Sequence, residues 1–516
     1  MYKVVLLFVL CTTVLGLHVD RALEPGTHGR DVVETVVYRI HRSRVFPDDR
    51  DFLRRVAYTE SKFGDDPQTY RSGYHGGVWQ FDRLKKTKYD DANDATSPYL
   101  RSIHASIKNK MGIDWMQVKE EDLLKPLYSG LAARIYIDLT SQSRGQIPDD
   151  IKGQDKFWKD WYHTQQGKYG DFEMRAKELL ERDMSTAGGK IDLMLVVDGS
   201  ASITKPKFQS ALDSLARLVN VFDLQEANVG MVTYSTIVTS VIPFLHNLTM
   251  EGLQDAINST RYPGQQTNTY AGMMEAINQF GTLPNDRIES GIPRLMVVLT
   301  DGLHNQGDLK PVVAAKLAAM SGIITCAFGI GDSIKVSELR EIANEDPDYI
   351  YTVQDYDTLR EQIARMARRA KTVPQTPKMG SETSETMKQV GEKRYYRFAV
   401  PENGTTIILI NEKGEIRGYW TYTSVEQPSS AFYDGVINAG ETFIPPPPAR
   451  QVRQRRDVSQ DAPANDVMIA LESFKVDSKA NVKIVQGDAR KSAATKVDVA
   501  CFMLVAAFSF AVLAIH

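Results

Sequence analysis

The stretch LMLVVDGSAS, residues 193–202, decides the fold class of this chain. Its apolar first half breaks abruptly into Asp198, Ser200 and Ser202, which alternate with the small residues Gly199 and Ala201. An unbroken apolar run of this length is typical of a strand buried on both faces, as in a parallel sheet covered by helices. In open sheets of that kind, ligands bind beyond the carboxyl ends of the strands. The stretch therefore predicts a site at the end of a central strand.

The surrounding residues 189–370 alternate between short apolar runs and amphipathic stretches. RLMVVLT (294–300) and GIITCAFGIG (322–331) have the composition of buried strands, whereas ALDSLARLVNVF (211–222) and DTLREQIARMARRA (357–370) have the period of helices. Strand–helix alternation predicts a doubly wound α/β fold, in which helices cover both faces of a mainly parallel sheet. Cys326 lies within one of these runs, and we expect it to be a buried strand residue.

The polar side chains that follow residues 193–197 are hard oxygen ligands. Asp198, Ser200 and Ser202 suit Mg²⁺, with Mn²⁺ and Ca²⁺ as alternatives, better than they suit zinc. One carboxylate and two hydroxyls neutralise such an ion only in part, so it would remain a strong Lewis acid. No Gly-Lys-Ser/Thr follows the strand, which excludes a phosphate-binding loop of the P-loop type.

The pattern Asp-x-Ser-x-Ser after an apolar strand resembles the von Willebrand factor type A domain. GQQTNTYAGM (264–273), MVVLTDG (296–302) and CAFGIGD (326–332) resemble later segments of that family in the same order. The resemblance covers residues 189–370 and implies a metal-ion-dependent adhesion site, whose open coordination position takes a carboxylate from a protein partner. The ligands that it implies are Asp198, Ser200, Ser202, Thr267 and Asp301. Gln265 and Gln266 stand where the family often has glycine.

Residues 28–180 form a separate, helix-rich region with many aromatic residues. DFLRRVAYTESKFG (51–64) predicts a helix capped by Asp48 or Asp49, with Glu60 on its apolar side. Burial of that kind favours the neutral form of a carboxyl group, as a general acid requires.

The order of motifs in this region resembles the lysozyme-like fold of lytic transglycosylases. That resemblance implies that Glu60 is the catalytic acid, that Gln80 lines the cleft and that Tyr162 contacts substrate. Pairing of Glu60 with Arg54 or Arg55 in a binding scaffold is the alternative. We favour the scaffold over an enzyme, because no second carboxylate can be assigned.

The C-terminal third of the chain predicts a β-sandwich over residues 389–488, preceded by a linker at 371–388. Alternating runs flank Lys413 and Gly414, which predicts a hairpin at that point. The sandwich is interrupted at 445–465 by an exposed loop that contains the dibasic pair Arg455-Arg456. The loop resembles a furin-type site, with cleavage after Arg456.

The two ends of the chain and its sequons indicate export. Residues 1–17 predict a signal peptide, and Asn247, Asn258 and Asn403 are acceptors for N-glycosylation. Residues 489–516 predict a GPI-attachment signal, with a C-terminal transmembrane segment as the alternative. The net charge of −3 shows no broad basic surface, which argues against nucleic acid as a partner.

These features together predict a multidomain protein of the cell surface or extracellular matrix. We expect its type A domain to bind a protein ligand through a divalent cation. A surface glycan hydrolase or transglycosylase that uses Glu60 and is targeted by the type A domain is one alternative. A structural matrix component without regulated binding is the other.

Overall fold

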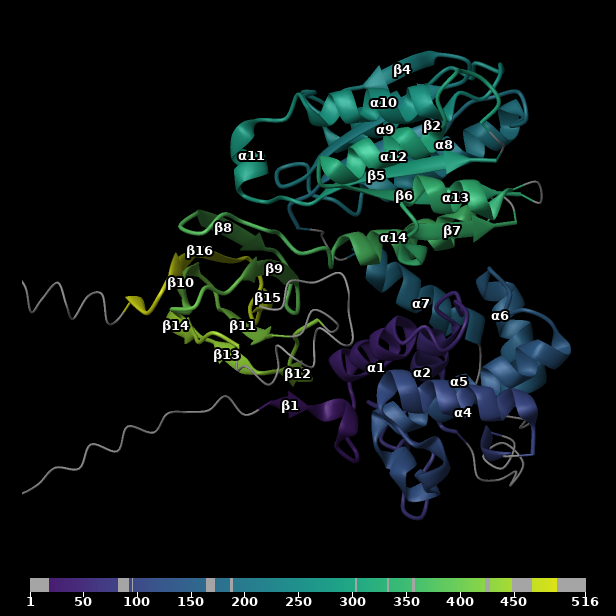
Figure 1. Cartoon of the computed structure of the whole chain (residues 1–516), viewed down its shortest axis with the longest axis vertical. Coiled ribbons are helices and arrows are strands. Elements are labelled where there is room, and N and C mark those ends of the chain that lie inside the picture. Colours follow the sequence, from purple (N-terminus) through teal and green to yellow (C-terminus); the bar gives the residue numbers. More distant parts are fainter. Residues whose placement is uncertain are drawn as a thin grey trace, which may run out of the picture.

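The computed structural model describes residues 18–81, 92–94, 96–163, 172–185, 189–301, 304–331, 334–354, 358–422, 427–447 and 466–489. Figure 1 shows three parts: a helical N-terminal part, an α/β part and a β-sandwich. The predicted signal peptide, Arg456 and the predicted attachment signal from residue 490 onward lie outside the described residues. Within the described residues, no helix combines the length and the apolar character needed to cross a bilayer.

The α/β part is built on a six-stranded sheet. Its strands are β2 (Asp192–Asp198), β3 (Asn228–Tyr234), β4 (Val238–Ile242), β5 (Arg294–Thr300), β6 (Ile323–Ile330) and β7 (Ile350–Val353). They lie in the order β4-β3-β2-β5-β6-β7, and all neighbours are parallel except the antiparallel pair β3 and β4. Residues 193–198 thus belong to an inner strand, and the predicted α/β sheet is confirmed.

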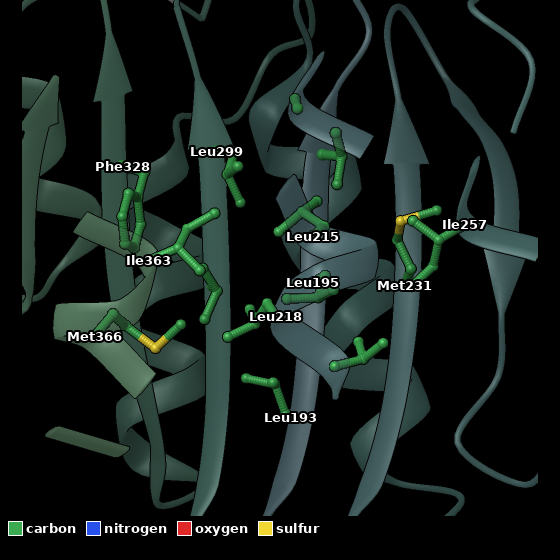
Figure 2. Packing of buried hydrophobic residues seen from close by; sticks show 14 of the residues in the cluster. Leu193, Leu195, Leu215, Leu218, Met231, Ile257, Leu299, Phe328, Ile363 and Met366 are labelled. Carbon is green, nitrogen blue, oxygen red and sulfur yellow. The ribbon is translucent and has the colours of Figure 1, made fainter. Parts of the chain in front are cut away.

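Helices cover both faces of this sheet. One face carries α8 (Lys205–Val219), α9 (Met250–Asn258) and α14 (Leu359–Ala370), and Figure 2 shows Leu215, Leu218, Ile257, Ile363 and Met366 packing there against the strands. The other face carries α10 (Thr269–Phe280), α12 (Pro311–Met320) and α13 (Val336–Ile342). A short helix, α11 (Asn285–Glu289), precedes β5. Cys326 is fully buried in β6, as expected.

The N-terminal part has its own apolar core. Its helices are α1 (Arg30–Arg42), α2 (Phe52–Ser61), α4 (Pro98–Met111), α5 (Pro126–Arg144), α6 (Ile151–Phe157) and α7 (Phe172–Ser185), with short 3₁₀ helices at 21–23, 115–117 and 120–124 and a π-helix at Trp158–Tyr162. The predicted helix is α2, but it is buried on every side rather than on one apolar face. Its N-cap residue is Asp51, whose side chain makes no capping hydrogen bond, and the predicted Asp49 instead accepts from the backbone nitrogen of Leu53 at 3.0 Å.

The C-terminal part is a sandwich of two four-stranded antiparallel sheets around a shared core. Its strands are β8 (Glu382–Met387), β9 (Lys393–Ala399), β10 (Thr405–Lys413), β11 (Ile416–Thr421), β13 (Gly435–Ile437), β14 (Gly440–Ile444), β15 (Asp466–Ser473) and β16 (Ser478–Gln486). The two-residue strand β12 (Phe432–Tyr433) lies outside these two sheets. The sheet orders are β14-β10-β16-β8 and β13-β11-β15-β9, so β15 and β16 are both inner strands.

Two predictions for this part are wrong. The segment around Lys413 and Gly414 is not a hairpin, because β10 and β11 belong to different sheets and the chain crosses the sandwich there. The predicted linker at 371–388 contains strand β8, in which Thr383, Glu385 and Met387 are buried and alternate with more exposed residues. Glu385 is tolerated inside because the Tyr396 hydroxyl donates to it at 2.6 Å and Lys190 lies 3.2 Å away.

The three parts are joined by charged contacts. Arg365 and Arg368 of α14 each lie 2.5 Å from a carboxylate of the N-terminal part, Asp48 and Asp51 respectively. The N-terminal strand β1 (Val19–Asp20) pairs antiparallel with β12 of the sandwich. A cavity of about 830 Å³ lies at the junction. Its lining charges pair with one another, as in the contact of Asp31 with Lys393 at 2.5 Å.

Candidate metal centre

The five side chains proposed as metal ligands come from three loops at the carboxyl end of the sheet. Asp198 is the last residue of β2, and Ser200 and Ser202 follow it. Thr267 precedes α10, and Asp301 follows β5, the strand next to β2. Because neighbouring parallel strands end at the same edge, side chains far apart in the sequence converge there.

Direct hydrogen bonds join four of the five side chains or their loops. The Ser202 hydroxyl donates to Asp301 Oδ1 at 2.8 Å, and the hydroxyls of Ser200 and Ser202 lie 2.9 Å apart. The backbone nitrogen of Ser200 donates to Asp198 Oδ1 at 2.8 Å. These contacts bring the alternating Asp-x-Ser-x-Ser residues and Asp301 into one cluster of oxygen atoms.

Thr267 is tied to the site through its loop. The backbone nitrogen of Ala201 donates to the carbonyl of Gln265 at 2.6 Å, which attaches this loop to the first one. Asn305 accepts from the Thr267 nitrogen at 3.0 Å through its side-chain oxygen. Gly199 lets the loops approach, since a Cβ there would lie 2.6 Å from Pro263 Cδ. The glutamines in place of the family's glycine therefore leave the approach of the two loops intact.

The charges of the site fit a cation. Asp198 is almost completely buried, and among the described residues it forms no ion pair. Burial raises the pKa of Asp198 to about 6, with a smaller contribution in the same direction from Asp301, although hydrogen bonds from Thr300 and Ser200 oppose it. Burial also raises the pKa of Asp301. Asp198, desolvated and without an ion pair among the described residues, carries a cost that a divalent cation held by these oxygens would compensate.

The donor set also fits the kind of ion expected. Within the described residues, no three His, Cys, Asp or Glu side chains gather to hold a metal. The cluster instead combines two carboxylates with three hydroxyls, Ser200, Ser202 and Thr267. Hydroxyl and carboxylate oxygens are the ligands of hard cations such as Mg²⁺. A cation there would supply a Lewis-acidic centre that attracts an external carboxylate.

Two residues of the site were missed by sequence reasoning. The Thr300 hydroxyl donates to Asp198 Oδ2 at 2.7 Å, and Asn305 holds the Thr267 loop. Thr300 stands directly before Asp301 in MVVLTDG, so a polar side chain ending an apolar strand was a usable signal. Asn305 carries no such signal, because only the folded loop brings it to Thr267.

Glu60 lies in the core of the N-terminal part, away from any metal ligand. The Trp158 ring nitrogen Nε1 donates to Glu60 Oε1 at 2.8 Å, and His163 Nδ1 lies 3.3 Å from the same oxygen. The expected arginine partners are engaged elsewhere, Arg54 with Asp183 at 2.8 Å and Arg55 with Gln154 at 2.8 Å. Glu60 is therefore paired, but with a tryptophan and a histidine rather than with an arginine.

The other two residues of the lysozyme-like resemblance do not join Glu60. The Gln80 amide donates to the carbonyls of Thr69 and Gly77 at 3.1 and 2.7 Å. Tyr162 is buried, and its hydroxyl donates to the carbonyl of Trp79 at 2.8 Å. The expectation that Tyr162 contacts substrate is wrong, because the core encloses its side chain.

The three sequon asparagines are all exposed. Asn247 precedes α9, Asn258 ends it, and Asn403 precedes β10 in the sandwich. Each side chain is accessible to an oligosaccharide, and their glycosylation stays a prediction.

Comparison with known proteins identifies the α/β part. Residues 192–365 match the model of the von Willebrand factor type A domain. The collagen alpha-1(XII) chain of Notophthalmus viridescens is 32% identical over 178 residues, which are 34% of this chain and 18% of the relative. Matrilin-1 of Gallus gallus is 28% identical over 177 residues, 34% of this chain and 35% of the relative. The similarity thus spans only about a fifth to a third of these relatives.

Solved structures resemble the chain over part of its length. Proximal thread matrix protein 1 from the mussel byssus, with a zinc-occupied MIDAS motif, is 22% identical with a TM-score of 0.32 and covers 36% of this chain and 46% of its own. The von Willebrand factor type A protein from Catenulispora acidiphila is 13% identical with a TM-score of 0.31, covering 58% and 63%. The lysozyme-like resemblance of residues 28–180 has no support in these findings and stays a prediction. Residues 192–365 of this chain are a von Willebrand factor type A domain.

Proposed function

We propose that this chain is an extracellular adhesion or matrix protein whose type A domain binds a protein partner through a divalent cation. The cation, Mg²⁺ in the first place, is held by Asp198, Ser200, Ser202, Thr267 and Asp301. A carboxylate of the partner completes its coordination. The similarity of this domain to domains of a collagen chain and a matrilin supports the matrix role.

One observation carries this proposal. Asp198 is buried at the end of an inner strand without an ion pair among the described residues, and it is surrounded by hydroxyls rather than by cationic groups. A carboxylate kept only for stability would have a basic partner, as Asp192 at the other end of β2 has in Arg287 at 2.7 Å. The arrangement around Asp198 supports the proposal that this carboxylate is a ligand of a cation.

The test is calorimetric titration of the secreted chain with Mg²⁺ and with Mn²⁺. Asp198→Ala should abolish binding of both ions, because it removes a charged ligand. The fold should survive, since Asp198 is the last residue of β2 and the other four ligands lie on loops beyond the sheet. Asp255→Ala is a matched control, because this aspartate is exposed on α9 and its loss should change nothing. Equal ion binding by wild type and Asp198→Ala would refute the site.

For the N-terminal part we propose a binding scaffold rather than a glycan hydrolase. Glu60 accepts from Trp158 and lies beside His163 inside the core, whereas Gln80 and Tyr162 bond to backbone carbonyls and do not join it. Cleavage of peptidoglycan or chitin by the secreted chain, lost in Glu60→Gln, would contradict the scaffold and establish the enzyme.

Three further expectations complete the proposed function and concern how the chain is processed. They are glycosylation at Asn247, Asn258 and Asn403, cleavage after Arg456, and membrane attachment through residues 489–516. Mass spectrometry of the secreted protein, before and after glycosidase treatment, tests the first two. Release from cells by a phospholipase specific for GPI anchors tests the third.

A further inference from the structure

Helix α12 of the type A domain has its apolar side chains in an unusual arrangement. The side chains that it buries against the sheet are small, namely Ala314, Ala315 and Ala318. The large ones point away from the sheet: Val313 is 37% exposed, Leu317 38% and Met320 85%. Burying alanines contributes little to stability, and exposing leucine and methionine keeps apolar area in water. The sequence of α12 is therefore explained poorly by folding alone.

The exposed residues form a continuous stripe. Leu309, 46% exposed, precedes the helix, and Val313, Leu317 and Met320 have the spacing of a single helical face. We call these four residues the α12 stripe. Helix α12 lies on the face of the sheet that carries α10 and α13, opposite to the face of α14, whose arginines contact the N-terminal part. Within the described chain these side chains stay accessible, with exposed fractions from 37% for Val313 to 85% for Met320.

The stripe begins at the rim of the metal centre. The backbone nitrogens of Asn305 and Gln306 donate to the carbonyl of Thr267 at 3.0 and 3.2 Å, and Leu309 follows three residues later. A protein segment that places a carboxylate on the cation therefore meets Leu309 next and can continue along α12. Apolar surface that adjoins a binding site in this way marks an interaction surface.

The stripe also carries one charge. Lys316 is exposed, it is the only charged residue of α12, and no ion pair of Lys316 occurs among the described residues. A cation on the rim and an ammonium group within the stripe both complement an acidic partner. The exposed methionine at the far end adapts readily to different apolar side chains.

We propose that the α12 stripe is the second half of the partner-binding surface. The partner class, which rests on the proposed function of the metal centre, is a protein segment that presents one carboxylate to the cation and aliphatic side chains to Leu309, Val313, Leu317 and Met320. An acidic residue between those aliphatic ones would pair with Lys316. In this proposal the cation binds the partner's carboxylate, and the α12 stripe determines which side chains are favoured in the partner residues next to that carboxylate.

The test uses a library of random 15-residue peptides displayed on phage and selected in Mg²⁺ on the immobilised secreted chain. Wild type should enrich peptides that combine Asp or Glu with at least two aliphatic residues. The double variant L317S/M320S should lose the aliphatic preference and bind the selected peptides about tenfold more weakly or worse, since burial of each such side chain contributes appreciably to affinity. The matched control is I288S/V476S, which removes two exposed apolar side chains remote from the rim.

The outcomes separate the two proposals. If D198A keeps the wild-type preference for a carboxylate, the metal-dependent function fails, whatever the stripe does. If D198A loses that preference but L317S/M320S selects and binds like wild type, the α12 stripe is not part of the surface. Enrichment of no peptide overturns the stripe proposal. Dimerisation of wild type in sedimentation experiments that L317S/M320S abolishes also overturns it, because the occupant is then a second copy.

Discussion

The Thr300 hydroxyl reaches across from β5 to Asp198 at the end of β2 and donates to its second carboxylate oxygen at 2.7 Å. The first oxygen of Asp198 already accepts from the Ser200 nitrogen. Both oxygens are thus fixed, one by strand β5 and the other by the loop that follows β2. A carboxylate held in this way is oriented before a cation arrives, which reduces the cost of ordering it on binding.

The first prediction follows from this contact. Thr300→Val keeps the shape of the side chain and removes the donor, so Asp198 loses part of its orientation. We expect Mg²⁺ affinity to fall by about 10–100-fold, the usual effect of removing such a support. Thr233→Val is the control, because its hydroxyl is buried in β3 of the same sheet without a hydrogen-bond partner. Equal losses in both variants, measured by calorimetry, would point to general damage to the sheet.

The second prediction concerns cleavage after Arg456. The fragment from residue 457 onward contains β15 and β16, the inner strands of both sheets of the sandwich. Their ladders with β9, β10, β11 and β8 hold the fragment in place without a disulfide. Denaturing gels of the cleaved protein should show two pieces, and native chromatography should show one. Release of the C-terminal piece under native conditions would contradict this.

The third prediction tests the contact between the type A domain and the N-terminal part. Arg368 donates from the same nitrogen to both carboxylate oxygens of Asp51, at 2.5 and 2.6 Å. In a double-mutant cycle of Asp51→Ala and Arg368→Ala, we expect a coupling energy of about 1–3 kcal/mol. Thermal unfolding of the four proteins measures it. Additive losses would show that the two side chains do not depend on each other.

The fourth prediction is a pH dependence that arises from Lys371. Burial lowers the pKa of Lys371 to about 8 in the folded chain, whereas an unfolded lysine titrates near about 10.4. Between these values the unfolded state binds more protons, so the free energy of unfolding rises with pH. Below pH 8 the buried ammonium group of Lys371 is charged, and its desolvation lowers the free energy of unfolding by the full amount. We expect the free energy of unfolding to rise by about 1 kcal/mol between pH 7.5 and 9.5, after allowance for solvent screening.

Lys371→Met should remove that gain, because the methionine keeps the apolar stem without the ammonium group. Urea unfolding midpoints at the two pH values, for wild type and variant, measure the difference. An unchanged pH dependence in Lys371→Met would assign the effect to other groups.

The type A domain could be predicted from the sequence because its signals are local. Each buried strand is an apolar run, and Asp198 and Asp301 stand where such runs end. The rest of the site required the fold. Asn305 meets Thr267 only after two loops from different strands converge, and no spacing in the sequence encodes that.

The sandwich shows where sequence reasoning fails. A glycine after Lys413 indicated a hairpin, but a turn residue does not specify whether the next strand returns to the same sheet or crosses to the other one. Strand β8 was not predicted, because two of its buried positions, Thr383 and Glu385, are polar. The alternation of apolar and polar residues that indicates a strand is therefore missing. The burial of Glu60 was correctly expected, but its partners depend on contacts almost a hundred residues away.

The placement of β16 has a mechanical consequence. A pulling force applied through the residues after Gln486 acts along this strand, which lies between β10 and β8 and is antiparallel to both. To extract β16, the force must shear two ladders at the same moment instead of unzipping one edge. The sandwich thereby resists, through the simultaneous shear of two ladders, a force applied through the residues that follow β16.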